Sequence, residues 1–173
     1  MEGDDSRDAI WDGTFKVYYE SFWSEIVAQR IVTFWQRLDD FTKVLVAITA
    51  SGSAIAGWAL WKEDNFKYIW LTLAAISALL SIIHASLAVA NRIKDWTETT
   101  RQFVVLRIEL ERCMENMKID KNFDVPGYLS KYNDYMGKYA DLYSTLKNDI
   151  LRTRNLEIKV QHELNERLKD LIQ

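Results

Sequence analysis

Two long uncharged stretches stand out in the pattern of hydrophobic and polar positions along the chain. Val44 to Trp61 holds eighteen consecutive residues without a charge, and Tyr68 to Asn91 holds twenty-four. A helix of about 20 apolar residues spans the ~30 Å hydrocarbon core of a bilayer. We therefore predict transmembrane helices over residues 44–61 and 68–91. Two buried helices of a soluble protein are the alternative, but such helices usually carry a polar position at every turn.

A short charged connection, Lys62 to Lys67, joins these stretches and predicts a tight transmembrane hairpin over residues 43–91. Aromatic side chains, which favour membrane interfaces, gather around it: Trp58, Trp61, Phe66, Tyr68 and Trp70. A tight hairpin leaves both flanks on one side of the membrane. Basic residues near the spans are more frequent on the flanks than in the connection, so both termini are predicted to be cytoplasmic. The acidic first residues differ from a cleaved signal peptide, so we expect both spans to be retained.

The first predicted span is rich in small residues. Gly52 and Ala56 lie four positions apart, as do Ser53 and Gly57, so the members of each pair share a helix face. Small residues at this spacing let two helix backbones approach closely. We therefore expect this span to pack against other helices.

The second predicted span carries a polar stripe. Its residues follow at steps of four, three, four and three, which places them on one helix face: Ser77, Ser81, His84, Ala88 and Asn91. Hydroxyl and imidazole groups are costly to bury in hydrocarbon. One interpretation is that the stripe lines a pore or gate in an oligomer, because ionisable residues in membranes often mark pathways. The other is that its side chains form hydrogen bonds to the first span within a single hairpin.

Helical periodicity continues on both sides of the hairpin. In residues 1–42, aromatic and aliphatic side chains recur at helical spacing from Phe15 to Phe41, and Asp12 and Thr14 are candidate N-caps. Residues 92–117 extend the second span and carry a heptad seam, the pattern of a coiled coil. The heptad seam consists of Trp96, Thr99, Phe103, Leu106, Leu110, Cys113 and Met117.

Residues 118–127 predict a break, because the chain there contains Pro126 and Gly127. Residues 128–173 then predict one long C-terminal helix. Its apolar face begins with a tyrosine row: Tyr128, Tyr132, Tyr135 and Tyr139. Such a row is usually helix core, and a stacking platform for nucleic acid bases is the alternative.

Composition favours an all-α membrane protein without an active site. The 173 residues include only six glycines and one proline, too few for a turn-rich sheet protein. The net charge is -3, and no block is basic enough to indicate nucleic acid binding. Phosphate-binding and hydrolase motifs are lacking, and the single cysteine excludes an intrachain disulfide. We expect no enzymatic activity, no metal and no cofactor.

The order of these parts resembles the SLATT family of bacterial two-helix membrane effectors. The resemblance covers residues 15–117 and includes the run from Asn91 to Glu111, which contains TrpThrGluThrThrArg and PheValValLeuArgIleGluLeuGlu. It implies a pore-forming effector of anti-phage defence in the bacterial inner membrane. Its gate would respond to a partner protein or to a nucleotide or oligonucleotide made by a nucleotidyltransferase, and opening would depolarise the membrane and arrest growth.

In this interpretation the heptad seam joins copies into a homo-oligomer, a tetramer by analogy with other two-helix channels. The candidate residues for an anionic ligand are basic: Arg30, Arg92, Lys94, Arg101, Arg107, Lys147, Arg152, Arg154 and Lys159. Ordinary solvated helix faces are the alternative for each of them. The helix after Tyr128 has no counterpart in the family pattern. A membrane-anchored coiled-coil scaffold that recruits a protein partner is the second hypothesis, and a small transporter is a weaker third one, because neither span carries an acidic residue.

Overall fold

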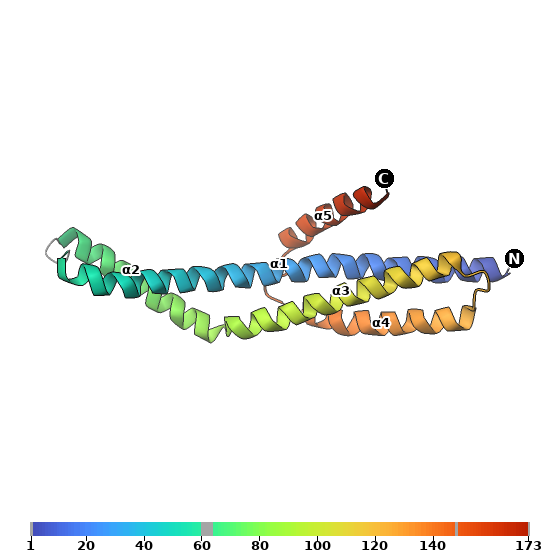
Figure 1. Ribbon diagram of the computed structural model, residues 1–173, viewed down its shortest axis with the longest axis horizontal. Coiled ribbons are helices and arrows are strands. Elements are labelled where there is room, and N and C mark those ends of the chain that lie inside the picture. The colour runs from blue at the N-terminus through green and yellow to red at the C-terminus, as the bar shows by residue number, and fades with distance from the viewer. Residues whose placement is uncertain (1, 60–63, 148, 173) are drawn as a thin grey trace. The chain divides into compact units, whose positions relative to one another are not determined.

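The computed structural model describes the backbone of residues 2–59, 64–147 and 149–172, and the side chains of residues 5–49, 68–69, 71–147 and 149–169. These ranges form five helices and no strand: α1 (Glu2–Ala59), α2 (Asp64–Ser86), α3 (Val89–Ile119), α4 (Val125–Lys147) and α5 (Arg154–Ile172) (Figure 1). The predicted all-α class is confirmed for them. Contacts divide the chain into a bundle unit, Met1–Ile31 with Trp96–Gln173, and a hairpin unit, Val32–Asp95.

Helix α1 runs without interruption through 58 residues. The sequence pattern predicts a helix that starts near Asp12 or Thr14 and a separate span from Val44, and the structure differs at both points. Thr14 lies inside the helix, where its Oγ1 donates to the carbonyl of Ile10 at 2.7 Å. Neither point carries a proline that would end the helix, so helical hydrogen bonding propagates through both.

The heptad seam of α3 lies in the core of the bundle unit. All seven of its residues are buried, and Phe103, Leu110 and Met117 are completely excluded from solvent. Several of them pack in one cluster with Val17 and Tyr18 of α1. Helices of the same chain therefore already cover this seam, and association of copies through it stays a prediction.

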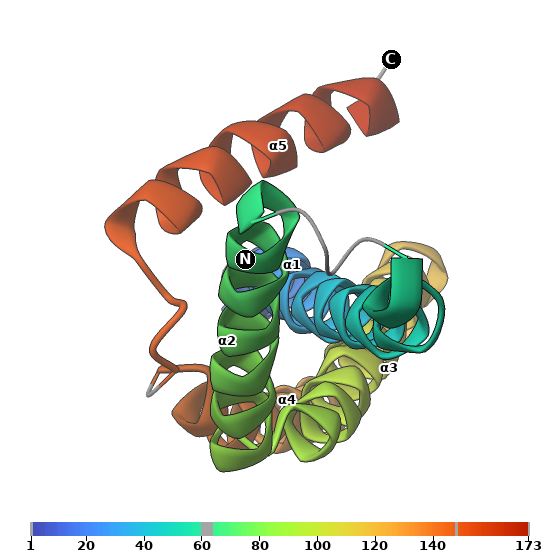
Figure 2. The same cartoon turned by 90° about the vertical axis from the view of Figure 1, so that its left-hand side faces the viewer.

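Helix α4 packs beside α3, as Figures 1 and 2 show. The rings of Phe103 and Tyr139 meet edge to face, with centroids 6.4 Å apart. Tyr132, Tyr135 and Tyr139 are half-buried against the core cluster, so the tyrosine row takes a core position. Gly13 makes room for it on α1, since a Cβ at that position would lie only 3.0 Å from Cε2 of Tyr132.

The break between α3 and α4 falls inside the predicted interval 118–127. Asp120 organises it: Oδ1 accepts the backbone N–H of Asn122 at 2.9 Å, and Oδ2 accepts the hydroxyl of Tyr128 at 3.1 Å. Pro126 stands in the first turn of α4, where its missing N–H would have no helical partner in any case.

A second break divides the predicted long helix 128–173 into α4 and α5. The Oδ1 atom of Asp149 accepts the N–H of Leu151 at 2.7 Å, which forms an Asx-turn. The Oγ1 atom of Thr153 accepts the N–H of Leu156 at 3.3 Å and acts as the N-cap of α5. Short polar side chains thus replace helical hydrogen bonds here.

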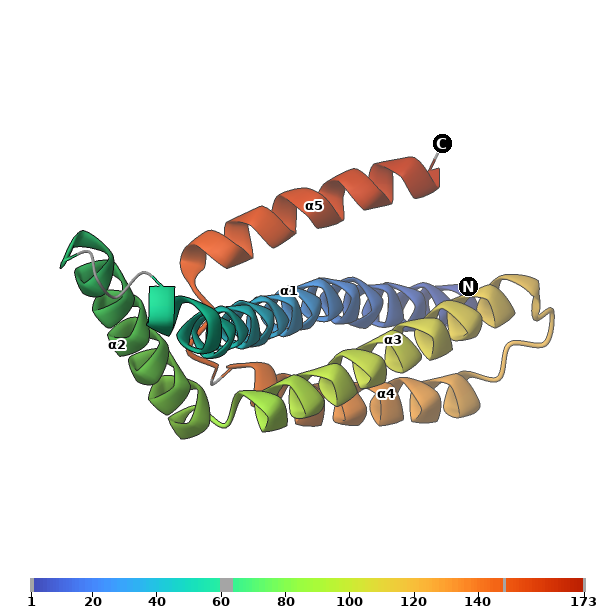
Figure 3. The same ribbon diagram turned by 60° about the vertical axis from the view of Figure 1, so that its left-hand side comes forward.

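Helix α5 covers a face of α1 within the bundle unit (Figure 3). Val160 and Leu164 are buried at 1% and 0% exposure. Arg30 of α1 pairs with Glu163 at 2.6 Å, and the side chain of Gln161 donates to the hydroxyl of Tyr19. Polar contacts therefore frame the apolar stripe that holds α5 in place.

In the hairpin unit, α2 begins at Asp64, inside the predicted connection Lys62–Lys67, and ends at Ser86. The sequence predicts a continuous helix to Asn91, but the structure breaks it before α3. Ala88 has a φ of 48°, in the left-handed region that a residue with a Cβ rarely adopts. The Nε atom of Arg92 donates to the carbonyl of Leu87 at 3.1 Å and so satisfies an acceptor at the end of α2.

The described part of the hairpin unit buries some polar side chains and exposes many large apolar ones. Thr42 and Ser77 are buried at 6% and 7% exposure, whereas Leu71, Leu79 and Ile82 are exposed at 60% or more. Among the described residues no single helix is long and apolar enough to span a bilayer. One bent pair meets the length and composition criteria, Leu71–Ser86 with Val89–Ile119, at an angle of 48°.

Candidate functional site

Two side chains of the predicted stripe face α1 within the hairpin unit. The hydroxyls of Ser77 and Thr49 lie 3.1 Å apart and share a hydrogen bond. His84 Nε2 lies 2.8 Å from Oδ1 of Asp39. Ser81 donates to the carbonyl of Ser77, one turn back on its own helix, at 2.9 Å. These contacts match the interpretation in which the hairpin satisfies its own polar groups, and pore lining stays a prediction.

The Asp39 carboxylate contacts two side chains, Lys43 and His84, at one end of this arrangement. Its Oδ2 accepts a hydrogen bond from Nζ of Lys43 at 2.5 Å, and its Oδ1 lies 2.8 Å from Nε2 of His84. Hydrogen bonds from Lys43 and then His84 lower the pKa of Asp39 despite its partial burial. The carboxylate is therefore held in its charged form.

The last two stripe residues do not continue the face formed by the first three. Ala88 lies in the break after α2, and Asn91 stands in the first turn of α3. Both are exposed. The prediction of one continuous stripe from Ser77 to Asn91 is therefore wrong, because the helix that would carry it is interrupted.

The predicted packing pairs of the first span fall on α1. The side-chain surroundings of Gly52, Ser53, Ala56 and Gly57 lie outside the described residues, as do Leu60 and Trp61 at the end of that span. Close packing of helices through these small residues remains a prediction.

Four of the nine predicted ligand-binding cations pair with carboxylates of the same chain. Arg30 pairs with Glu163 at 2.6 Å, Arg101 with Glu98 at 2.6 Å, Arg107 with Glu25 at 2.7 Å and Arg152 with Glu157 at 2.7 Å. Hydrogen bonds from Arg101 and then Gln102 lower the pKa of Glu98 to about 2. An anionic ligand would have to compete with these carboxylates.

The other five cations are also not gathered into one site by any contact within the described residues. Arg92 bonds to Leu87 and lies over the ring of Trp35, 5.1 Å from its centroid. The remaining four are exposed and form no ion pair within the described part of the chain: Lys94, Lys147, Arg154 and Lys159. The structure thus assembles no cluster of these basic residues.

The bundle unit contains a cleft that the sequence pattern did not predict. Its volume is 460 Å³, and α1, α4, α5 and the turn before α5 contribute its lining: Tyr19, Glu20, Trp23, Tyr139, Tyr143, Arg152, Glu157 and Gln161. All eight residues are half-buried. Four of them carry aromatic rings, and those of Tyr139 and Tyr143 stack 5.5 Å apart.

Arg152 lies at the centre of the contacts in this cleft. Its Nε donates to Glu157 at 2.7 Å, and its Nη2 donates to the hydroxyl of Tyr143 at 2.9 Å. The guanidinium lies over the rings of Trp23 and Tyr143, 5.4 and 5.0 Å from their centroids. Burial lowers the pKa of Arg152, but the bonds to Tyr143 and Glu157 more than offset this and raise it. Arg152 is therefore a firmly charged internal cation.

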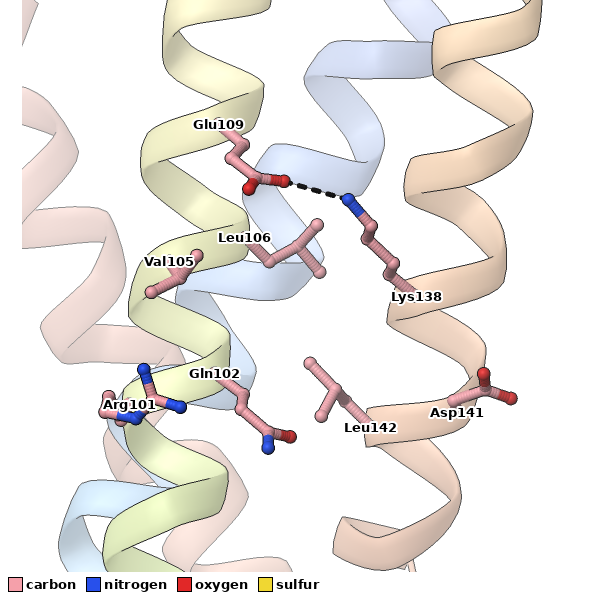
Figure 4. A pocket seen from close by; sticks show the side chains of 8 residues that line it. All are labelled: Arg101, Gln102, Val105, Leu106, Glu109, Lys138, Asp141 and Leu142. Atoms are coloured by element: carbon pink, nitrogen blue, oxygen red, sulfur yellow. Dashed lines mark hydrogen bonds and ion pairs between the residues drawn. The ribbon is translucent and has the colours of Figure 1, made fainter.

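A second groove of 320 Å³ lies between α3 and α4 (Figure 4). Lys138 spans it to Glu109 at 3.1 Å and also pairs with Asp134 at 3.0 Å. Leu106 and Leu142 form part of its floor. Its charges are largely matched within the chain.

No group of three metal-ligating side chains occurs within the described residues. The comparisons with known proteins add no relative: no family model, no curated protein and no solved structure matches this chain. The function must therefore be inferred from the chemistry of the hairpin unit and of the cleft.

Proposed function

We propose that the protein is a membrane protein, inserted through the hairpin unit, with the bundle unit on the cytoplasmic side. One observation carries this proposal: the hairpin unit exposes Leu71, Leu79 and Ile82 while it buries Thr42 and Ser77. Water disfavours an exposed apolar surface of this kind, and contiguous patches usually mark a partner or a membrane. Hydrocarbon favours the same surface and requires the polar groups to bond to one another.

We further propose that the protein acts as a pore-forming effector of anti-phage defence, as its resemblance to SLATT effectors implies. Ser77 and His84 make polar contacts with α1 in the same unit that exposes Leu71, Leu79 and Ile82. In an oligomer, a change of partner for these groups would turn them toward a shared path for ions. A nucleotide ligand or partner protein would control this change through different affinities for the closed and open states.

Membrane insertion is tested by a charge on the exposed apolar face. Ile82→Lys places an ammonium in the predicted hydrocarbon region, at a cost of about 2.5–3.5 kcal/mol. The matched control is Ile158→Lys on α5, since Ile82 and Ile158 are similarly exposed at 63% and 59%. We expect Ile82→Lys to shift the protein from the membrane fraction toward the soluble or degraded fraction, while Ile158→Lys leaves it in the membrane. Equal fractionation of both variants would contradict the proposal.

Pore formation is tested by membrane potential during induced expression in bacteria, followed with a potential-sensitive dye. We expect rapid depolarisation by the wild type and its loss in Ser81→Leu and His84→Leu at unchanged membrane levels. Ile83→Leu is the control, because it exchanges one exposed aliphatic side chain for another on the same helix. Depolarisation that persists in both stripe variants would exclude the stripe from the pathway.

A second candidate function is a membrane-anchored helical scaffold that recruits a protein partner. The bonds from Ser77 to Thr49 and from His84 to Asp39 favour it, because they satisfy the stripe without any pore. An undisturbed membrane potential in the wild type, with a partner retained by the stripe variants, would favour this scaffold.

A further inference from the structure

The aromatic cleft of the bundle unit has an unbalanced charge. Two carboxylates, those of Glu20 and Glu157, line it together with one guanidinium, that of Arg152. Glu157 offsets the charge of Arg152 and accepts a hydrogen bond from its Nε at 2.7 Å, and the Tyr143 hydroxyl accepts one from its Nη2 at 2.9 Å. The buried Nη1 has no hydrogen-bond partner within the described residues. One negative charge therefore remains in the cleft.

That remaining charge belongs to Glu20 on α1. The side chain is half-buried, and it forms no hydrogen bond or ion pair within the described residues. Lys16 stands one turn earlier on the same helix but is exposed and does not pair with it. A partly buried carboxylate without a hydrogen bond or ion pair loses hydration that no described residue replaces. A bound cation would replace it.

The walls of the cleft suit a cation that has an apolar body. Aromatic faces attract ammonium groups through the ring quadrupole, and the attraction grows when water is excluded. Arg152 already makes two such contacts, with Trp23 and Tyr143. The rings of Tyr19 and Tyr139 complete the lining, and Gln161 contributes an amide. The 460 Å³ volume falls within the range of about 300–1,000 Å³ found for small-molecule sites.

We propose that this cleft binds a small organic cation, an ammonium group carried on a compact apolar body, with Glu20 as its counter-ion. The proposal reverses the sign of the ligand that Arg152 suggests when the sequence is considered alone. It goes beyond the membrane activity proposed above and does not depend on it, because binding is measured on the purified chain.

The first experiment compares the binding of three probes: a cation, a neutral molecule of the same shape, and an anion. Choline carries the ammonium, 3,3-dimethylbutanol is its neutral isostere, and inorganic phosphate is the anion. Binding is followed on the full chain in detergent by fluorine NMR of fluorotryptophan, with the Trp23 signal assigned through Trp23→Phe. We expect choline to shift the Trp23 signal and to bind at least about tenfold more tightly than the isostere.

Two carboxylate variants then test the role of Glu20. Glu20→Gln keeps the shape of the side chain and removes its charge, so choline affinity should fall by about tenfold. Asp141→Asn removes one charge from the groove between α3 and α4 and should leave affinity unchanged. Thermal unfolding of each variant shows whether the fold is retained.

Three results would overturn the proposal. Choline could bind no better than its neutral isostere, Glu20→Gln could retain full affinity, or phosphate could shift the Trp23 signal while choline does not. The last result would instead assign the cleft to anions that displace Glu157 from Arg152. None of these results bears on membrane insertion or depolarisation, which Ile82→Lys and the stripe variants test separately.

Discussion

The bundle unit and the hairpin unit place apolar side chains in opposite ways. The bundle unit has a core of fully buried large apolar residues, with Phe103, Leu110 and Leu164 at 0% exposure. Twelve of the twenty exposed large hydrophobic side chains among the described residues belong to the shorter hairpin unit. The bundle unit thus has an apolar core of its own, whereas the hairpin unit carries most of the exposed large apolar side chains among the described residues.

Truncation of one large apolar residue in each unit should give the largest difference in the free energy of unfolding. Phe103→Ala removes a fully buried ring and should lower the free energy of unfolding by about 3–5 kcal/mol. Ile82→Ala removes atoms that are already 63% exposed and should change it by less than about 1 kcal/mol. Thermal and denaturant unfolding of the purified protein measures both. Similar losses would mean that the two units share one kind of core.

Charged residues sharpen the comparison within the bundle unit. The side chain of Arg107 is 22% exposed and pairs with Glu25, which is 12% exposed. Arg107→Met leaves this partly buried carboxylate without a partner and should cost about 1.5–3 kcal/mol. Arg101→Met breaks the ion pair with Glu98, in which the two side chains are 64% and 48% exposed. It should lower the free energy of unfolding by less than about 1 kcal/mol. Equal effects in denaturant unfolding would show that the Arg107 pair is no better shielded from water.

The polar contact inside the hairpin unit should have a moderate, pH-dependent effect. Asp39→Asn weakens the bonds to Lys43 and His84, and interhelical polar contacts in membranes contribute about 0.6 kcal/mol on average. Because the folded-state pKa of Asp39 is lowered, its contribution is present above the unfolded pKa of about 4 and is lost as the pH falls through the folded value. The difference in unfolding free energy between wild type and variant should therefore shrink below about pH 4. A difference that stays constant on acidification would show that the negative charge of Asp39 does not contribute to the stability of the fold.

A glycine on the outer surface of the bundle unit offers a small change that stabilises the fold. No atom lies within 4 Å of a Cβ placed on Gly137, so Gly137→Ala should stabilise α4 by about 0.5–1 kcal/mol. Gly13→Ala is the matched comparison, because its Cβ would meet the ring of Tyr132 at 3.0 Å. We expect its gain in helix propensity to be offset by this contact. Thermal midpoints that rise equally in both variants would show that Tyr132 moves freely.

Periodicity was a good guide to the bundle unit. Steps of three and four predict the heptad seam, and every one of its residues is buried. What periodicity could not show is which surface covers the seam. A repeat of apolar positions fixes the buried face of a helix but not the identity of its partner, and here α1 and α4 of the same chain supply it.

The helix breaks differ in how visible they are in the sequence. Pro126 marks the break before α4, and the polar Asp149 and Thr153 mark the one before α5 once their hydrogen bonds are known. The break at Ala88 has no proline or glycine near it. The hydrogen bond that Arg92 donates to the carbonyl of Leu87 beside this break is not visible in the local sequence pattern. The polar stripe that runs across it was predicted on a helix that does not continue.

The aromatic cleft could not be predicted because its parts are distant in sequence. Glu20 and Trp23 come from α1, whereas Arg152 and Gln161 follow more than a hundred residues later. The sequence presents Arg152 as one basic residue among many. Only the fold shows that Glu157 neutralises it and that Glu20 is left over.

The burial of Cys113 has a practical consequence for labelling chemistry. It is the single cysteine of the chain and lies in the heptad seam at 5% exposure. Burial raises the pKa of its thiol, so little of the reactive thiolate is present at neutral pH. A cysteine introduced on an exposed face should therefore react with maleimide or spin-label reagents selectively, with the native thiol left in place. The wild-type chain already serves as its own unlabelled background for distance measurements.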